Sequence, residues 1–408
     1  MINFKFLYAL AICVVSYSQA GLKEQHEGLE PLPDKIHQGE ETIALIGGGL
    51  ASRMIHYGEF ETEAYLRNEG KKLIIRNMAD EGNTPGFRPN SNRDSPWAFP
   101  GAQEFYKGSE LAVKISTKGF YPNPDKWLEM VEADHVLAFF GFNAAYERGV
   151  GGLDIYKQEL AAFVDHTLAQ QYNGETAPNL VLVSPTAIQD LSVKYSTPNG
   201  IKENQALEAY TQAIEEVAKA KGVKFIDLFT PTKELFASTK EEYTVDGALL
   251  LSNGYQFIAP IIADAIFGKS KVDESKRAAV KTAVQEKNYY WNNDYKVPNG
   301  VHVYGRRYKP FGPDNYPYEV QKTREMTMIR DSAIWAAVKG QSLDIAAADA
   351  NTLELPPVET NYTPQSEGSN GRGTSASKMG QLGYLSGKEV QETLVTAEGY
   401  QVELFASE

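Results

Sequence analysis

Residues 41–54 read Glu-Thr-Ile-Ala-Leu-Ile-Gly-Gly-Gly-Leu-Ala-Ser-Arg-Met. The apolar run Ile43–Ile46 is of strand type and ends in three glycines, and a segment with helical character begins at Leu50. A strand that passes through a glycine turn into a helix is how open α/β folds begin, and the site usually lies at that turn. From Gly47 to Gly49 there is no acidic or hydroxyl side chain. This turn therefore lacks the nucleophile that a catalytic turn would carry.

Strand-like and helix-like runs alternate after this stretch, as far as residue 268. Four further runs have strand character: 72–76, 135–140, 179–184 and 223–227. Helical patterns lie between and after them at 155–171, 204–221 and 254–267. Continuously apolar strands that alternate with helices indicate a parallel sheet covered on both faces. We therefore predict an α/β domain over residues 41–268.

Composition and charge limit the classes of partner. The chain has 408 residues, of which 42% are hydrophobic and 23% charged, which is typical of a large globular domain with additional segments. Its net charge is −13 and its pI is near 5.1. Because phosphate binding needs clustered Lys and Arg, this balance argues against nucleic acid and anionic membranes as partners.

The N-terminus predicts an exported protein. A lysine at position 5 precedes the apolar run 6–15, and small residues at Ser18 and Ala20 suit cleavage after Ala20. The run is too short to span a membrane. Two alternatives are a buried N-terminal element and a lipoprotein cleavage box ending at Cys13, which the preceding Ile12 fits poorly. We expect a secreted or periplasmic protein whose mature chain, having lost its only cysteine, forms no disulfide.

The remaining segments flank the α/β domain. Residues 21–40 read as a polar lead-in, and 83–124 as a long loop rich in Pro, Gly and Asn. Residues 269–345 predict a helical extension, in which the Tyr- and Trp-rich block 289–295 either seals the extension against the domain or forms a platform for carbohydrate.

The C-terminal part is predicted to be a linker and then a new domain. Residues 346–387 are rich in small and polar residues, as flexible linkers are. Residues 388–408 become strand-like from 392 to 406, as the first strands of a further β domain would. We therefore expect the chain to be covalently continuous with a C-terminal domain.

Four short motifs follow strands or precede helices of the predicted sheet. They are Gly47–Gly49, the segment around Gly82, Gly141-Phe-Asn143 and Asp246-Gly-Ala-Leu249. In an open α/β sheet such positions lie at the carboxyl edge of the strands, where ligands bind. We expect these motifs to meet in one site.

This order of motifs resembles the SGNH (GDSL) hydrolases, a family of esterases and acetylhydrolases. The resemblance covers residues 41–268 and implies a three-layer, flavodoxin-like fold. It also implies an oxyanion hole from the Gly82 N–H and Asn143, and a remnant of the Asp-x-x-His motif at Asp246. The chain departs from the family pattern where Gly48 and Gly49 occupy the Asp and Ser positions and Leu249 occupies the His position. Because that chemistry needs a hydroxyl and a base, the resemblance implies half of a site.

Other residues could supply the missing chemistry. Ser52 and Ser184 are candidate nucleophiles, although a helix surface position and a strand-end cap are the simpler interpretations. Asp246 with Asp80 or Glu81 could form a carboxylate pair acting on a sugar. We expect structural or exposed roles for four of the six histidines, which are His56, His135, His166 and His302.

Cofactor signals are weak. The three glycines lack the spacing of a dinucleotide-binding turn, and the chain has no His-x-x-x-His motif or clustered Asp pattern for a metal. We expect neither a cofactor nor a metal.

Three hypotheses follow. The first is a binding or scaffolding module for a small molecule or glycan that lacks the Ser–His pair. The second is an active ester hydrolase with a relocated nucleophile or base, and the third is a glycosidase-type carboxylate site. The order of leader, SGNH-like domain, helical segment, linker and strand also resembles the front of large secreted bacterial proteins that continue into propeller-type dehydrogenase and haem-binding regions.

Overall fold

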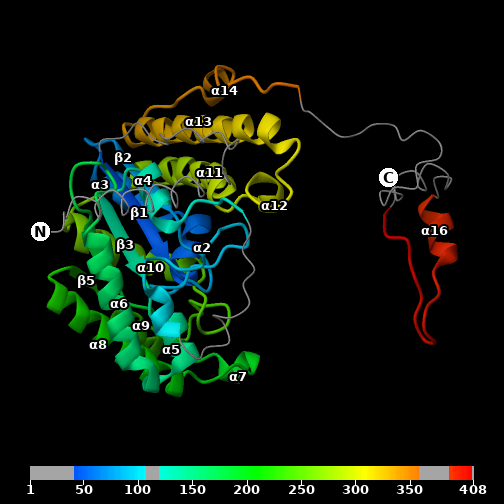
Figure 1. Ribbon diagram of the computed structural model, residues 1–408. Coiled ribbons are helices and arrows are strands. Elements are labelled where there is room, and N and C mark those ends of the chain that lie inside the picture. The colour runs from blue at the N-terminus through cyan, green and yellow to red at the C-terminus, as the bar shows by residue number, and fades with distance from the viewer. Residues whose placement is uncertain (1–40, 107–118, 358–385, 407–408) are drawn as a thin grey trace, which may run out of the picture. The chain divides into compact units, whose positions relative to one another are not determined.

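The computed structural model describes residues 41–106, 119–357 and 386–406. Five parallel strands form one sheet in the order β2-β1-β3-β4-β5 (Figure 1). Their bounds are β1 Glu41–Gly47, β2 Leu73–Asn77, β3 His135–Phe139, β4 Asn179–Val183 and β5 Lys224–Ile226. The predicted α/β architecture with a parallel sheet is confirmed.

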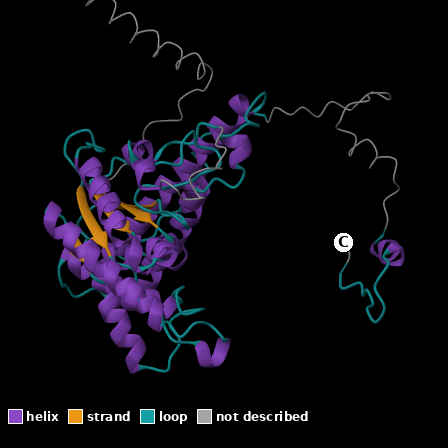
Figure 2. Cartoon of the chain, turned by 60° about the horizontal axis from the view of Figure 1, so that its bottom comes forward, coloured by secondary structure: helices purple, strands orange, loops and turns teal. Residues whose placement is uncertain are grey.

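Two apolar cores lie on the two faces of this sheet, because alternate side chains of a strand point to opposite faces. On β1, Ile43 and Leu45 belong to one core, whereas Ala44 and Ile46 belong to the other. Helices α2 Gly49–Tyr57, α3 Glu59–Arg67 and α10 Ser252–Phe267 contribute to the first core. Helices α4 Pro124–Met130, α6 Leu153–Leu168 and α8 Ile201–Lys221 contribute to the second. The strands thus lie between helices (Figure 2).

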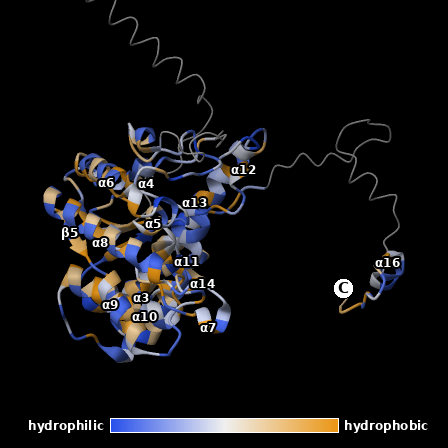
Figure 3. Ribbon diagram, turned by 90° about the horizontal axis from the view of Figure 1, so that it is seen from below, coloured by the Kyte–Doolittle hydropathy of each residue, from blue (hydrophilic) through white to orange (hydrophobic). Residues whose placement is uncertain are grey.

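Shorter elements complete the layers. They are α5 Phe142–Arg148, α7 Ser192–Tyr195 and α9 Phe229–Ser238, with 3-10 turns at Ala102–Tyr106, Val150–Gly152 and Glu274–Lys276. Around α8 and α9, hydrophobic and hydrophilic residues occupy different sides of each helix (Figure 3). This pattern is expected of helices that bury one face against a sheet.

The predicted helical extension is present, and it packs beside β2 and α3. It consists of α11 Arg277–Tyr295, α12 Gly300–Val303, α13 Gly312–Val338 and α14 Ile345–Asp349 (Figure 1). The aromatic block 289–295 forms the end of α11. Trp291 is fully buried, and its indole N–H donates to the Asn77 carbonyl at 2.7 Å. For Trp291, sealing against the domain is therefore the correct interpretation.

Three buried ion pairs, which we call the interlock, stabilise the extension. Two of them join it to the α/β domain, and one joins two of its own helices. Arg76 of β2 pairs with Asp331 of α13 at 2.5 Å, and Lys287 of α11 pairs with Glu61 of α3 at 2.5 Å. The third pair joins α13 to α11, between Arg324 and Asp294 at 2.8 Å. No side chain of the interlock is more than 4% exposed.

The folded unit continues beyond residue 345. The Lys322 ammonium donates to the Leu353 carbonyl, and the Leu353 N–H donates to the Glu325 carboxylate at 2.7 Å. Residues 346–353 therefore belong to the folded unit and not to the expected linker. Arg330 of α13 also pairs with Asp349. The extension's first helix, α11, begins at Arg277.

A second compact unit comprises residues 360–408. In its described part, α16 spans Gly387–Thr393 and is stabilised by a capping box between Ser386 and Glu389. Residues 394–406 contain no strand, so the expected strand character is not found there. The further β domain stays a prediction, as do the leader, lead-in and central linker, because 1–40 and 358–385 lie outside the described residues. In the described ranges, no helix is long and apolar enough to cross a membrane.

Candidate functional site

The glycine turn between β1 and α2 is shaped by a close approach to β3. Gly47 has φ +129°, and a Cβ on it would lie 2.1 Å from the Phe139 carbonyl oxygen. The next N–H, that of Gly48, donates to the same oxygen at 3.0 Å. Only glycine fits at position 47. By contrast, a Cβ on Gly49 would meet only the Glu81 side chain, at 3.9 Å.

A cavity of about 180 Å³, the glycine pocket, opens at this turn. The predicted site residues that line it are Gly48, Gly49, Gly82, Asn143 and Leu249. The remaining lining is Leu50, Glu81, Asn83, Phe139–Phe142, Ser184–Thr186, Ala248, Leu250 and Tyr255. The structure therefore brings all four sequence motifs to one place, as expected from their positions at the carboxyl edge of the sheet.

Hydrogen-bond donors gather at one end of the glycine pocket. The Asn143 amide donates to the Asn83 carbonyl at 3.0 Å, and its nitrogen would lie 3.1 Å from a Cβ on Gly48. An amide nitrogen carries two hydrogens, so one remains to bind a ligand oxygen. Helix α2 begins at Gly49, and its first-turn N–H groups have no partner within the helix. Such donors can stabilise a carbonyl or oxyanion.

Asp246 does not line the glycine pocket. Its carboxylate accepts the N–H groups of Ala248 at 2.9 Å and Leu249 at 2.8 Å, so it caps its own turn. The side chain is exposed and lies on a separate hollow of about 610 Å³. The spacing of the Asp-x-x-His motif is present, with Leu249 at its last position, and the carboxylate of Asp246 binds the backbone of its own turn.

Ser52 is held in a charged cluster between the domain and the extension. Its hydroxyl donates to Glu81 at 2.8 Å and accepts from the Lys296 ammonium at 2.8 Å. Lys296 also pairs with Asp80 at 3.0 Å and with Glu81 at 3.4 Å. Ser52 is 2% exposed. It lines neither the glycine pocket nor the larger cavity described below, which contacts Lys296.

The two carboxyl groups of the cluster titrate differently. Burial raises the pKa of Asp80, and the nearby Lys296 only partly offsets this. Burial also acts to raise the pKa of Glu81, but hydrogen bonds from Ser52 and Asp80 outweigh it and lower that pKa to about 2. A carboxylate with so low a pKa is a weak base, so Glu81 is poorly suited to activate the Ser52 hydroxyl.

Ser184 has a structural role. Its hydroxyl accepts the N–H groups of Leu228 at 2.8 Å and Phe229 at 3.1 Å, and it donates to the Pro185 carbonyl at 3.0 Å. The side chain is fully buried. Ser184 therefore caps the start of α9, as the simpler sequence interpretation holds.

None of the four histidines in the described ranges is hydrogen-bonded to a serine. His135 bonds Glu41 at 2.7 Å, His166 bonds Asp125 at 2.9 Å, and His302 bonds Asn299 at 2.7 Å. His56 is exposed on α2, and partial burial together with Lys296 and Arg53 lowers its pKa. The described residues thus contain no Ser–His pair at this edge.

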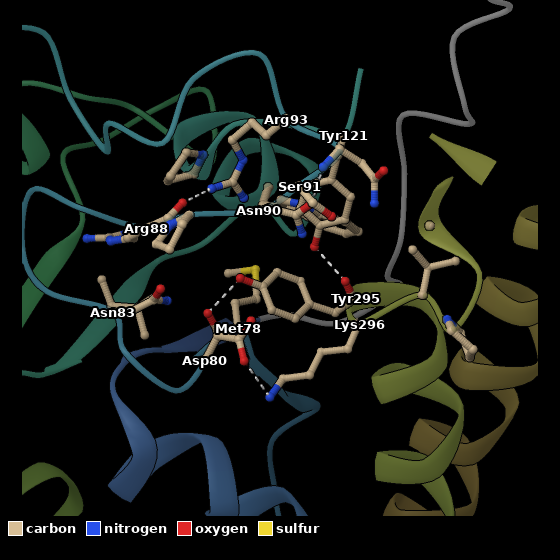
Figure 4. A pocket seen from close by; sticks show the side chains of 18 of the residues that line it. Met78, Asp80, Asn83, Arg88, Asn90, Ser91, Arg93, Tyr121, Tyr295 and Lys296 are labelled. Carbon is tan, nitrogen blue, oxygen red and sulfur yellow. Dashed lines mark hydrogen bonds and ion pairs between the residues drawn. The ribbon is translucent and has the colours of Figure 1, made fainter. Parts of the chain in front are cut away.

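A second and larger cavity of about 490 Å³, the polar pocket, lies on the other side of the charged cluster (Figure 4). It is built by the ends of β1 and β2, the loop 88–93, residues 121–128, and residues 295–301 of the extension. Asn83 lines both pockets. Sequence reasoning missed this pocket and Lys296, because no local pattern marks a lysine as the partner of residues more than 200 positions away. Among the described residues, no cluster of potential ligands could hold a metal ion.

No protein-family model and no curated protein matches the chain. Solved structures that match over part of it include a lipase/acylhydrolase from Enterococcus faecalis, with 16% identity over 57% of this chain and 99% of that one, and a TM-score of 0.35. Another is described as a GDSL-like lipase from Parabacteroides merdae, with 14% identity over 58% of this chain and 100% of that one, and a TM-score of 0.38. A third is a mutant of an acetylxylan esterase from Geobacillus stearothermophilus, with 13% identity, 58% and 98% coverage, and a TM-score of 0.37.

Proposed function

We propose that residues 41–268 form an SGNH-type domain that binds a small ligand in the glycine pocket without hydrolysing it. The observation that carries this proposal is the pairing of an assembled pocket with missing reactive groups. Asn143 and the start of α2 converge on the pocket, while Gly49 and Leu249 stand where a hydroxyl and an imidazole would be needed. Acyl transfer requires both groups, whereas binding a carbonyl requires only the donors.

The pocket favours a compact ligand with one polar end. Its volume of about 180 Å³ is below that of sites for drug-sized molecules, which span roughly 300–1,000 Å³. Apolar side chains such as Leu50, Phe142 and Leu250 line most of it, and Asn143 contributes a side-chain amide. A short acyl group with its carbonyl oxygen toward Asn143 fits this distribution.

Restoring the missing groups tests the proposal directly. A side chain at position 49 meets no close neighbour, so Gly49→Ser is compatible with the turn. We expect the wild-type chain to be inactive on aryl acetates and acetylated sugars, and Gly49→Ser/Leu249→His to hydrolyse them. Addition of Asn143→Ala to the double variant should reduce its rate by about 10²–10³-fold, the usual cost of an oxyanion donor. Asn293→Ala, on α11 and outside the pocket, is the matched control.

An active hydrolase with a relocated nucleophile is the second candidate, and one contact favours it. The Ser52 hydroxyl oxygen lies 2.8 Å from Lys296 Nζ, a distance at which the lysine, once deprotonated to the neutral amine, could take the hydroxyl proton. Wild-type esterase activity that disappears in Ser52→Ala and in Lys296→Met would establish this candidate and refute the first.

A further inference from the structure

The polar pocket is the strongest unexplained feature of the described chain. We propose that it is a second binding site, for a neutral polyhydroxylated ligand such as a saccharide ring. Its solvent-facing lining includes Asp80, Asn90, Ser91, Asn92, Tyr295 and Lys296. The volume of about 490 Å³ lies within the range of small-molecule sites. This inference goes beyond the glycine pocket and does not require the proposed function to hold.

The wall of the polar pocket is preformed by close packing around Asn92. A Cβ on Gly300 would lie 2.5 Å from the Asn92 amide nitrogen, and a Cβ on Gly305 would lie 2.4 Å from its side-chain oxygen. A Cβ on Gly119 would lie 2.3 Å from the Asn92 carbonyl oxygen. Three glycines from two separate segments therefore approach Asn92 as closely as only glycine permits. A pocket fixed in this way binds with little ordering cost.

The exposed groups provide both donors and acceptors. The amides of Asn90 and Asn92 and the hydroxyl of Ser91 can do both, Asp80 can accept, and Lys296 can donate. A sugar hydroxyl also donates and accepts, so a ring with several hydroxyls can satisfy such a mixed set. The Tyr295 ring, whose hydroxyl donates to the Met78 carbonyl at 2.8 Å, adds an aromatic surface (Figure 4).

Lys296, the most exposed cation of the polar pocket, is already paired, which argues against an anionic ligand beside it, whereas Arg88 and Arg93 are buried and the Arg88 Nε has no hydrogen-bond partner among the described residues. Lys296 is neutralised by Asp80 and Glu81. Arg93 donates to the carbonyls of Arg88 at 2.7 Å and Pro122 at 3.0 Å. The Arg88 side chain points away from Lys296 in Figure 4, and its guanidinium lies 5.2–5.3 Å from the ring centres of two buried phenylalanines.

The test is ligand titration of the full chain, followed by NMR or calorimetry. The probes are the neutral disaccharides cellobiose, maltose and xylobiose, with sodium sulfate and glucuronate as anionic comparisons. We expect at least one neutral disaccharide to bind with a dissociation constant on the order of 1 mM, and sulfate not to bind. Asn90→Ala should weaken that binding about tenfold, which corresponds to one or two lost hydrogen bonds.

Two variants guard against indirect effects. The Asn90 side chain also accepts the Asn92 N–H at 2.9 Å, so its removal could loosen the loop. Ser91 is exposed, and Ser91→Trp should block the pocket while the fold stays intact, as unfolding in urea would verify. Asn293→Ala, on α11 and outside both pockets, should leave disaccharide binding unchanged. The proposal is overturned if no neutral saccharide binds, if sulfate binds instead, or if Ser91→Trp has no effect.

Discussion

The interlock and the glycine pocket use polar side chains in opposite ways. In the interlock, Arg76 and Asp331 are each at most 1% exposed and satisfy one another. At the glycine pocket, the two decisive positions are held by Gly49 and Leu249, which bring no charge or hydroxyl. In the interlock, charged side chains attach the extension to the domain. The glycine pocket has hydrogen-bond donors but neither of the two reactive groups. The comparison indicates that the extension is an integral part of the folded unit.

The largest expected effect concerns the interlock. Asp331→Ala would leave the Arg76 guanidinium buried without its partner, and we expect a loss of about 3–5 kcal/mol in the free energy of unfolding. Urea denaturation measures this loss. Glu208→Ala is the matched control, because Glu208 and its partner Lys233 are about half exposed, and it should cost less than about 1 kcal/mol. Equal costs for the two variants would remove the distinction between interlock and surface.

A smaller effect is expected at the edge of the glycine pocket. Ser184→Ala would deprive the N–H groups of Leu228 and Phe229 of their acceptor, so we expect a loss of about 1–2 kcal/mol in the free energy of unfolding. The activity of the restored Gly49→Ser/Leu249→His variant should be unaffected. A complete loss of that activity on addition of Ser184→Ala, with folding intact, would show that Ser184 belongs to the reactive machinery.

The smallest effect is a change in pH dependence at the charged cluster. The pKa of Glu81 is lowered from 4.5 to about 2, so its contribution to stability is present above pH 4.5 and is lost as the pH falls toward 2. Glu81→Gln should therefore make unfolding less sensitive to pH within that window. Because Glu81 is largely exposed, the change should be small.

Asp80 provides the counter-check. Its raised pKa means that the folded chain binds a proton more readily than the unfolded chain, so its contribution to stability grows as the pH falls. Asp80→Asn should therefore alter the pH dependence in the direction opposite to Glu81→Gln. Urea unfolding at several pH values from 2.5 to 6 would compare the two. Shifts of the same sign would show that the carboxyl groups do not titrate as assigned.

The sheet could be predicted from the sequence because its strands are buried on both faces. The runs at 72–76, 135–140 and 179–184 each have an apolar centre of at least three residues, and each coincides with a strand to within one residue at either end. The convergence of the four motifs was also predictable, since parallel strands place their carboxyl ends together.

Long-range pairing could not be predicted. Arg76 interrupts an apolar strand, which signals that some buried partner exists, but nothing local identifies Asp331. Lys296 follows an aromatic block and gives no sign that it contacts Ser52 and Asp80. At Asp246 the sequence shows the spacing of the motif but not the contacts of the carboxylate, which accepts two N–H groups of its own turn.

The pairing of Arg76 with Asp331 also bears on the order of events during synthesis. The two residues are 255 positions apart, so the edge strand is translated long before its counter-ion exists. At roughly 5–20 residues per second, that interval is about 13–50 s. Until α13 has been translated, burial of β2 would leave the Arg76 guanidinium without its counter-ion. We therefore expect the side of the sheet next to β2 to stay hydrated until α13 has been synthesised. A chaperone that binds this exposed surface would act at that stage.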